Sequence, residues 1–278
     1  MKIQLLISTY NEGIFRVEKV LLPPMDGLSY LVSHQYTCEY CLPIPQSLLR
    51  EDVIISQISS SGISANRNNS IKCASGDVVV LLDDDVRLKT EYIESLKTLF
   101  ETHPEVDVAC CKIKTFAGEP EYKVYPEQEK LLQNIGALKA VSSIEISFRL
   151  RSVRDKGIWF DERFGLGTTV KSGEELLFLN ACIEKGLNIR YFPIFTVEHS
   201  YLSTTKNQSA FSDERLFATG AQAYVLYGKM AFLRNFFAVF RRFGTLRKEN
   251  ISALHFIKMK LAGSNYIYRK EKSLQNKN

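Results

Sequence analysis

Residues 78–85 read Val-Val-Val-Leu-Leu-Asp-Asp-Asp, five consecutive apolar side chains followed at once by three carboxylates. A short apolar run rich in valine is typical of a strand buried on both faces of a sheet. Adjacent carboxylates repel one another, so the end of this strand calls for a compensating charge. Because side chains alternate along an extended chain, Asp83 and Asp85 are expected on one side and Asp84 on the other.

Two interpretations of this acidic triplet stay open from its sequence alone. Oxygen ligands favour Mg²⁺ or Mn²⁺, and a cation held by one or two carboxylates typically also takes the phosphates of a substrate. Alternatively, the triplet is a solvated acidic turn that leads into the helix expected near Thr90.

Short apolar runs and helical patterns alternate on both sides of this strand. Further strands are expected at residues 3–7, 30–32, 53–55, 106–112, 144–150, 188–192 and 195–199, and helices at 63–74, 91–102 and 173–185. Ser60 or Ser61 is the expected N-cap of the first helix and Thr90 that of the second. The alternation predicts an α/β fold with a mostly parallel central sheet flanked by helices. Ligands in such sheets bind beyond the carboxyl ends of the strands.

The last part of the chain has a different character, helical and strongly basic. Residues 221–278 carry 12 basic and 2 acidic side chains, against 24 and 29 in residues 1–220. In one interpretation these helices only pack, with Lys and Arg toward water. In the other, which we favour, their aromatic and basic side chains lie on an anionic membrane surface. No nucleic-acid-binding motif is visible, so DNA or RNA is not an expected partner.

Composition and cysteine usage exclude several classes of protein. The 278 residues are 45% hydrophobic and 24% charged, which is ordinary for a globular protein and unlike a disordered or collagenous chain. Cys38 and Cys41 are the one CxxC pair among six cysteines, so we expect reduced thiols in the cytoplasm rather than a zinc site. We expect neither a signal peptide nor a membrane span.

Six segments, in order and spacing, resemble the inverting family 2 glycosyltransferases over about residues 1–205. They are Ile-Ser-Thr-Tyr-Asn-Glu at 7–12, Gly-Ile-Ser-Ala-Asn-Arg-Asn-Asn-Ser-Ile at 62–71, the triplet at 83–85, Phe-Asp-Glu-Arg-Phe-Gly-Leu-Gly at 160–167, Gly-Glu-Glu at 173–175 and Val-Glu-His at 197–199. The resemblance implies the GT-A fold. It implies a catalytic domain at 1–205, with a nucleotide-sugar half at about 1–115 and an acceptor half at about 116–205, followed by the basic helical extension at 206–278.

The resemblance also implies roles for particular residues. Residues 83–85 match the Asp-x-Asp motif, and the implied metal ligands are Asp85, Asp83 and His199. Glu175 matches the catalytic base, with Glu174 as the other candidate; a position in the first turn of a helix favours an ionised carboxylate. The implied nucleotide- and donor-binding residues are Ser8, Thr9, Tyr10, Glu12, Ser33, His34, Arg67, Asn68, Asp83, Asp84, Gly165 and Gly167.

The implied function is the metal-dependent transfer of a sugar, with Mg²⁺ or Mn²⁺ as cofactor and a UDP-sugar as the favoured donor. The implied acceptor is a glycan or lipid-linked glycan of a cell-surface polysaccharide such as a capsule, which would bring the cytoplasmic enzyme to the inner face of the membrane. The chain departs from the family at Ser33-His34-Gln35, where the family usually has an acidic residue that binds the base. The identity of the nucleotide therefore stays open.

Two other functions remain as alternatives. A sugar nucleotidyltransferase of the same fold is disfavoured because residues 8–12 lack the Gly-rich cationic loop that meets a triphosphate. A catalytically degenerate binding subunit is favoured by the altered segment after the second strand and opposed by the presence of Asp85 and Glu175.

Overall fold

The computed structural model describes residues 1–37, 42–202 and 209–276, so the CxxC pair lies outside the described residues. The chain divides into two compact units. The first comprises Met1–Asp161 and Phe178–Tyr201, and the second comprises Glu162–Leu177 and Leu202–Asn278. Residues 162–177, expected with the catalytic part, therefore group with the C-terminal helices. The domain boundary near residue 205 stays a prediction, since compactness alone does not define a domain.

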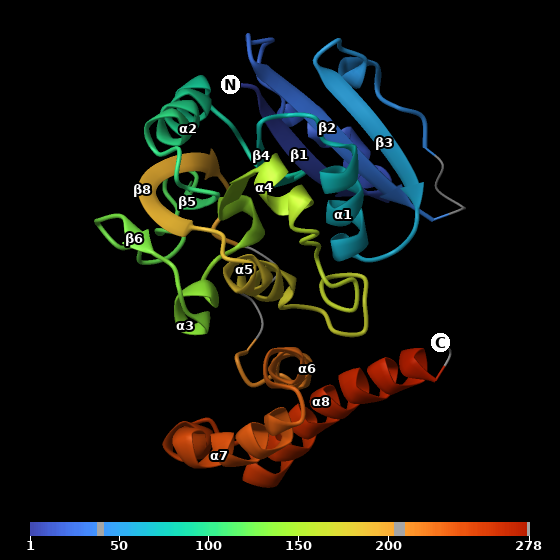
Figure 1. Ribbon diagram of the computed structural model, residues 1–278, viewed down its shortest axis with the longest axis vertical. Coiled ribbons are helices and arrows are strands. Elements are labelled where there is room, and N and C mark those ends of the chain that lie inside the picture. The colour runs from blue at the N-terminus through green and yellow to red at the C-terminus, as the bar shows by residue number, and fades with distance from the viewer. Residues whose placement is uncertain (38–41, 203–208, 277–278) are drawn as a thin grey trace. The chain divides into compact units, whose positions relative to one another are not determined.

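The described residues of the first unit build an eight-stranded sheet in the order β3-β2-β1-β4-β7-β5-β8-β6 (Figure 1). The strands are β1 (Ile3–Tyr10), β2 (Leu28–Tyr36), β3 (Val53–Ser59), β4 (Val78–Asp83), β5 (Val108–Lys114), β6 (Lys130–Leu131), β7 (Ile146–Arg149) and β8 (Ile189–Glu198). β1 to β4 are parallel, β7 runs antiparallel between β4 and β5, and β6 is antiparallel to β8. Ser8 is in register with Asp83, the last residue of β4, and β1 continues to Tyr10 at the same edge of the sheet.

Helices and short turns cover this sheet. The longer helices are α1 (Ile63–Cys73) and α2 (Thr90–Thr102), and the shorter elements are η1 (Asn11–Phe15), η2 (Val17–Lys19), η4 (Gln46–Leu48), α3 (Ile135–Leu138), η5 (Ser143–Glu145) and α4 (Leu150–Asp155). α1 packs against β1 and β2. The apolar face of α2, which includes Leu96 and Phe100, shares one core with Leu5 and Ile7 of β1. Such burial explains why β4 is apolar from Val78 to Leu82 and why β1 has apolar residues at Ile3 and from Leu5 to Ile7.

Three helices form most of the second unit: α6 (Asp213–Tyr227), α7 (Met230–Lys248) and α8 (Ala253–Gln275). α6 and α8 approach closely at Gly220 and Gly263, where an added Cβ would lie 1.9 Å from a backbone carbonyl oxygen of the other helix. Asn235 of α7 donates to Ser264 of α8, which donates to the carbonyl of Gly220, so one buried polar chain joins all three helices. No helix in the described part of the chain has both the length and the apolar character to cross a bilayer.

Candidate active site

Asp84 is turned into the protein at the end of β4. It is 7% exposed, and its carboxylate accepts hydrogen bonds from Thr9 Oγ1 at 2.5 Å and from Arg16 Nε and Nη2 at 3.0 and 2.7 Å. A Cβ at Gly13 would lie 2.2 Å from Asp84 Oδ2, so the close approach of η1 requires glycine there. Burial raises the pKa of Asp84, and the bonds from Thr9 and Arg16 oppose that rise. Asp84 therefore fixes the turn that follows β1.

Asp83 lies on the other side, partly exposed, beside Arg67 of α1. The Arg67 guanidinium is buried, lies 3.5 Å from Asp83 Oδ1 and sits 5.6 Å from the centre of the Phe160 ring. Arg67, implied as a donor-binding residue, thus pairs with a carboxylate of the acidic triplet. It places a fixed positive charge at the carboxyl end of β4.

Asp85 faces His199, the residue that follows β8. His199 Nε2 lies 3.4 Å from Asp85 Oδ1, and His199 Nδ1 donates to the backbone carbonyl of Ser200 at 2.7 Å. The hydrogen bond to His199 lowers the pKa of Asp85, and the same contact raises the pKa of His199. Asp85 is largely exposed, so this pair borders solvent.

A short backbone bridge brings these two residues together. Arg87 N donates to Glu198 O and Glu198 N donates to Arg87 O, both at 2.8 Å. Glu198 is also fixed by Lys89 Nζ and by the Tyr92 hydroxyl, each at 2.8 Å. The segment after the acidic triplet is therefore tied to the end of β8, although the two are more than 100 residues apart in sequence.

The Asp85 and His199 side chains suit a divalent cation that completes its shell with water and phosphate. Because Nδ1–H donates to a carbonyl, a neutral His199 turns the lone pair of Nε2 toward Asp85 Oδ1. Two electron-rich atoms at 3.4 Å repel unless a proton or a cation lies between them, and a backbone-anchored imidazole is typical of metal-binding histidine. Within the described ranges, no group of three or more His, Cys, Asp or Glu side chains is placed to hold an ion. The residues present thus fit a cation with few protein ligands.

The polar residues of β1 and β2 mostly make internal contacts. Ser8 and Ser33 are buried, and the Ser33 hydroxyl donates to the carbonyl of Asn66. His34 is fully buried; its Nε2 donates to the carbonyl of Asn11, and its Nδ1 accepts from Gln57. Burial lowers the pKa of His34. These contacts hold the backbone at the strand ends.

Tyr10 and Glu12 differ from these neighbours because both are exposed at the end of β1. Tyr10 is 47% exposed, so its ring is accessible to a ligand. Asn68 instead exchanges two hydrogen bonds with the backbone of Phe160, at 3.0 and 2.8 Å. Trp159, the single tryptophan of the sequence, is 43% exposed.

The remaining predicted residues belong to the second unit. Glu174 and Glu175 begin α5 (Glu174–Glu184), the first buried and the second partly exposed. Gly165 and Gly167 have φ of 102° and 81°, which favours glycine at both positions. The Thr168 hydroxyl lies 2.9 to 3.1 Å from the carbonyl oxygens of Arg163, Gly165 and Val170, so its single hydrogen is shared among three acceptors inside their loop.

Comparison with known proteins agrees with this geometry. Residues 46–159 match the family model described as "Glycosyl transferase family 2", a segment that contains α1, the acidic triplet and Phe148 to Trp159. Residues 46–159 belong to glycosyltransferase family 2. The predicted family and the predicted enzyme class, a glycosyltransferase, are thereby confirmed. No curated protein matches the chain.

Solved structures with the same fold as this glycosyltransferase include those of S. aureus TarS. TarS 1–349 has a TM-score of 0.59 at 15% identity, with 98% of this chain and 92% of that chain covered. The complex of TarS 1–349 with UDP-GlcNAc has a TM-score of 0.57 at 19% identity, covering 82% and 67%. Against a longer TarS structure, with a TM-score of 0.52 at 19% identity, the chain covers 81% of its own length and 40% of the other. The predicted GT-A fold is confirmed.

Two residues with clear roles in the site of this glycosyltransferase were missed from the sequence. Arg16 neutralises Asp84, and Asn66 donates from Nδ2 to the carbonyl of Thr9 at 3.0 Å. Asn66 lies within the quoted segment 62–71, one position before Arg67, so its place next to a candidate residue was an available signal. For Arg16 there was none, because its contact with β4 depends on the path of η1.

Proposed function

We propose that the protein transfers a sugar from a nucleotide-diphospho-sugar to a glycan or lipid-linked glycan, with inversion at the anomeric carbon and with Mg²⁺ or Mn²⁺. The observation that carries the proposal is the facing of Asp85 and His199 beyond the ends of β4 and β8, with His199 anchored through Nδ1. Parallel sheets of this kind bind ligands at that edge.

Displacement at an anomeric carbon requires a base for the acceptor hydroxyl, a stabilised leaving group and in-line placement of the two. When bound, the metal neutralises charge on the departing diphosphate. Asp85 and His199 would hold it, and Asp83 borders the same edge. Arg67 adds a fixed positive charge beside Asp83, which suits an anionic leaving group. Glu175, or Glu174 beside it, takes the proton of the acceptor hydroxyl.

A UDP-sugar is the donor that we favour. The structures of the same fold include TarS in complex with UDP-GlcNAc and with UDP, which supports a uridine nucleotide. The exposed ring of Tyr10 is available to stack on the base. The backbone around Ser33 and His34, rather than their buried side chains, then shapes the pocket.

We place the acceptor in cell-surface polysaccharide synthesis, as the resemblance to the family implies. With a lipid-linked acceptor, the enzyme would act from the cytoplasm as a peripheral protein at the inner face of the membrane. The proposed membrane location depends on the acceptor being lipid-linked, so it is tested separately from donor binding.

Calorimetric titration with UDP, GDP and CMP, each with and without Mn²⁺, tests the donor assignment. We expect UDP to bind, and Mn²⁺ to tighten its binding at least about tenfold, since a cation held by Asp85 and His199 would neutralise charge on the diphosphate. Asp85→Asn should lose the gain from Mn²⁺ while it keeps the fold. Asp155→Asn, which alters an exposed carboxylate of α4, is the matched control and should behave as the wild type.

Failure to bind any of the three nucleotides, by protein with a cooperative thermal transition, would overturn the proposal in favour of a degenerate binding subunit. Equal binding with and without Mn²⁺ would remove the metal from the proposal and leave the nucleotide assignment intact.

A further inference from the structure

The outward face of α7 is apolar. Its inward side is formed by Ala231, Asn235, Ala238, Val239 and Leu246, which are buried. The opposite side carries six large apolar residues that are 47 to 66% exposed: Met230, Leu233, Phe236, Phe237, Phe240 and Phe243. They recur at spacings of three and four, so they share one face of the helix, here called the α7 stripe. A helix that only packs on its neighbours normally turns polar side chains outward.

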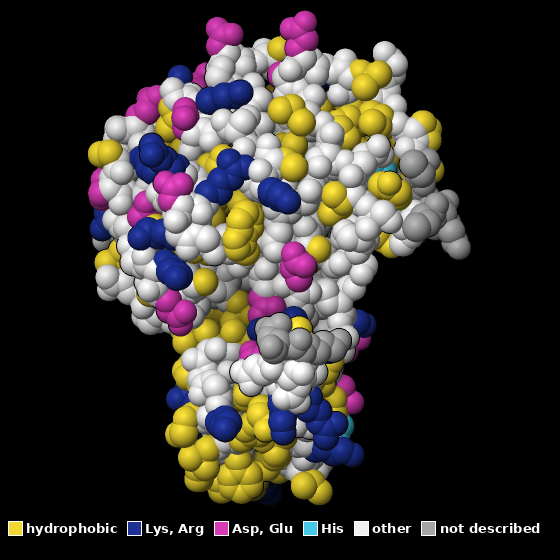
Figure 2. Space-filling view, turned by 45° about the vertical axis from the view of Figure 1, so that its right-hand side comes forward, with side chains coloured by type: hydrophobic (Ala, Val, Ile, Leu, Met, Phe, Trp, Pro, Cys, Tyr) yellow, Lys and Arg dark blue, Asp and Glu magenta, His cyan; other side chains and the backbone are white. Residues whose placement is uncertain are grey.

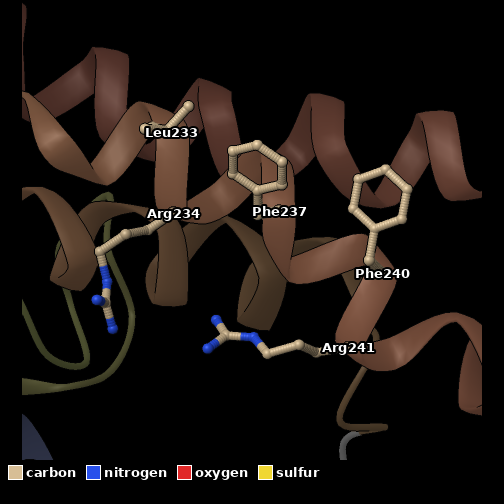
Figure 3. Close-up of a pocket in the computed structure, with 5 residues that line it drawn as sticks. All are labelled: Leu233, Arg234, Phe237, Phe240 and Arg241. Atoms are coloured by element: carbon tan, nitrogen blue, oxygen red, sulfur yellow. The ribbon is translucent and has the colours of Figure 1, made fainter.

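The stripe is continuous. The ring centres of Phe236, Phe237 and Phe240 lie 5.6 to 6.3 Å apart. Leu233, Phe237 and Phe240 also line a shallow hollow of about 560 Å³, which Arg234 and Arg241 border (Figure 3). Figure 2 shows hydrophobic side chains gathered at one end of the C-terminal unit, with Lys and Arg side chains nearby. Exposed apolar surface of this extent marks an interaction site.

Positive charge follows the stripe along one edge. α7 contains five cationic side chains and no acidic one. Arg234, Arg241 and Lys248 are spaced seven residues apart, so they lie in a row two turns apart beside the stripe. The Arg234 guanidinium lies 3.9 Å from the centre of the Tyr227 ring, and this contact fixes the N-terminal member of the row.

An anionic bilayer fits both features better than another copy of the chain. Self-association through α7 would bring a second set of five cations against the first, and α7 itself contains no acidic side chain to pair with them. A bilayer offers acyl chains to the aromatic rings and phosphates to the cations. The length and charge of α7 suit a helix that lies in the interface and does not cross it.

We propose that α7 lies in the headgroup region of an anionic membrane, with the α7 stripe toward the acyl chains and the row of Arg234, Arg241 and Lys248 at the phosphates. The apolar face enters about 5–10 Å, as interfacial helices do. The inference goes beyond glycosyl transfer and does not depend on it, because lipid binding needs neither donor nor acceptor.

Sedimentation of the full chain with vesicles tests the inference. Wild-type protein should bind vesicles containing phosphatidylglycerol, bind pure phosphatidylcholine vesicles much more weakly, and lose affinity as salt is raised. Phe237→Ser combined with Phe240→Ser should weaken binding at least about tenfold, because two exposed rings no longer enter the lipid. Leu254→Ser with Leu274→Ser, which changes two apolar residues of α8 that are 76 and 60% exposed, is the matched control and should bind normally.

Replacement of two cations of α7 separates the electrostatic contribution to membrane binding from the apolar one. Arg241→Gln with Lys248→Gln should lower affinity for anionic vesicles by more than about tenfold, since each cation near the surface contributes roughly fivefold. Lys258→Gln with Lys272→Gln on α8 removes the same charge away from α7 and should have the smaller effect. Circular dichroism and UDP titration of every variant show that it is folded and that donor binding is unchanged.

Three outcomes would overturn the inference. Wild-type protein does not sediment with anionic vesicles, or the α8 pairs weaken binding as much as the α7 pairs. The third outcome is a dimer in sedimentation velocity, without vesicle binding, that the double variant Phe237→Ser, Phe240→Ser dissociates. The α7 stripe would then be a contact between two copies of the chain.

Discussion

Asp83, Asp84 and Asp85 are chemically identical and adjacent in the chain, yet each has different surroundings. Asp84 is bound by Thr9 and Arg16, Asp85 faces His199, and Asp83 lies beside Arg67. Strand alternation explains the opposite directions of the middle and outer carboxylates. The triplet therefore combines one carboxylate that fixes a turn with two that border the predicted metal site.

Replacement of Asp84 tests the role of the inward carboxylate. Asp84→Asn removes its charge and one acceptor from the contact with Arg16, and leaves the Thr9 hydroxyl with a weaker partner. We expect a loss of about 1–3 kcal/mol in the free energy of unfolding, as for other buried hydrogen bonds to charged groups. Urea denaturation measures it. Donor affinity should fall because the turn after β1 loosens, whereas the response to Mn²⁺ should persist; loss of that response alone would assign Asp84 to the metal.

The two glutamates that begin α5 can be separated by their effects on rate. Glu175→Gln keeps size and hydrogen bonding but removes the base, so the transfer rate should fall at least about a hundredfold while donor affinity stays within twofold. Glu174→Gln is the neighbouring control and should retain most activity. Rates with saturating UDP-sugar and acceptor decide the matter. If the large loss follows Glu174→Gln instead, the base is Glu174.

At the scale of elements, apolar runs predicted the strands well and the local geometry poorly. Residues 188–192 and 195–199 were expected as two strands but form one, β8, in which Pro193 coincides with a shift in the register of pairing with β5. The expected N-caps were wrong: Gly62 caps α1 with φ of 98°, and Lys89 precedes α2. Antiparallel β7 was also not foreseen, since an apolar pattern does not encode strand direction.

The candidate site was predictable in part for a physical reason. Asp85 and His199 each follow a buried strand, and the rule for parallel sheets places both at one edge. Their contact at 3.4 Å depends on the backbone bridge between Arg87 and Glu198 and on the order of four strands. Neither is visible in the residues themselves, so the family resemblance could group Asp85 and His199 as metal ligands but could not give their contact.

Replacement of glycine by alanine should have opposite effects on stability at two kinds of position: where α6 packs on α8, and where a helical glycine has open space around it. Gly263→Ala adds a Cβ that would lie 1.9 Å from the carbonyl oxygen of Phe217, so the helices must separate, at a cost of about 1–3 kcal/mol. Gly220→Ala should cost a similar amount. Gly244→Ala on α7 meets nothing within 4 Å and should stabilise by about 0.5–1 kcal/mol, because alanine is the better helix former. Thermal unfolding monitored by circular dichroism compares the three. An unaffected Gly263→Ala would contradict the close approach of α6 and α8, and a destabilised Gly244→Ala would contradict the open surroundings of Gly244.

At the scale of the whole molecule, His199 and His34 have opposite effects on how stability depends on pH between pH 5 and 8. Contact with Asp85 raises the pKa of His199, so its contribution is present at low pH and is lost as pH rises through the folded-state pKa. Burial lowers the pKa of His34, whose ordinary value is about 6.5. Below that pH the unfolded chain binds a proton that the folded chain does not, so His34 makes stability fall as pH falls.

Replacement of His34 isolates its share of this pH dependence. His34→Gln keeps a donor for the carbonyl of Asn11 and does not titrate, whereas His199 is untouched. The melting temperature of the wild type should therefore drop more between pH 7.5 and 5.5 than that of the variant, even if the variant is less stable throughout. Calorimetry at four pH values gives both slopes. Parallel slopes would mean that folded His34 takes up its proton as readily as it does in the unfolded chain, because protonation then favours neither state.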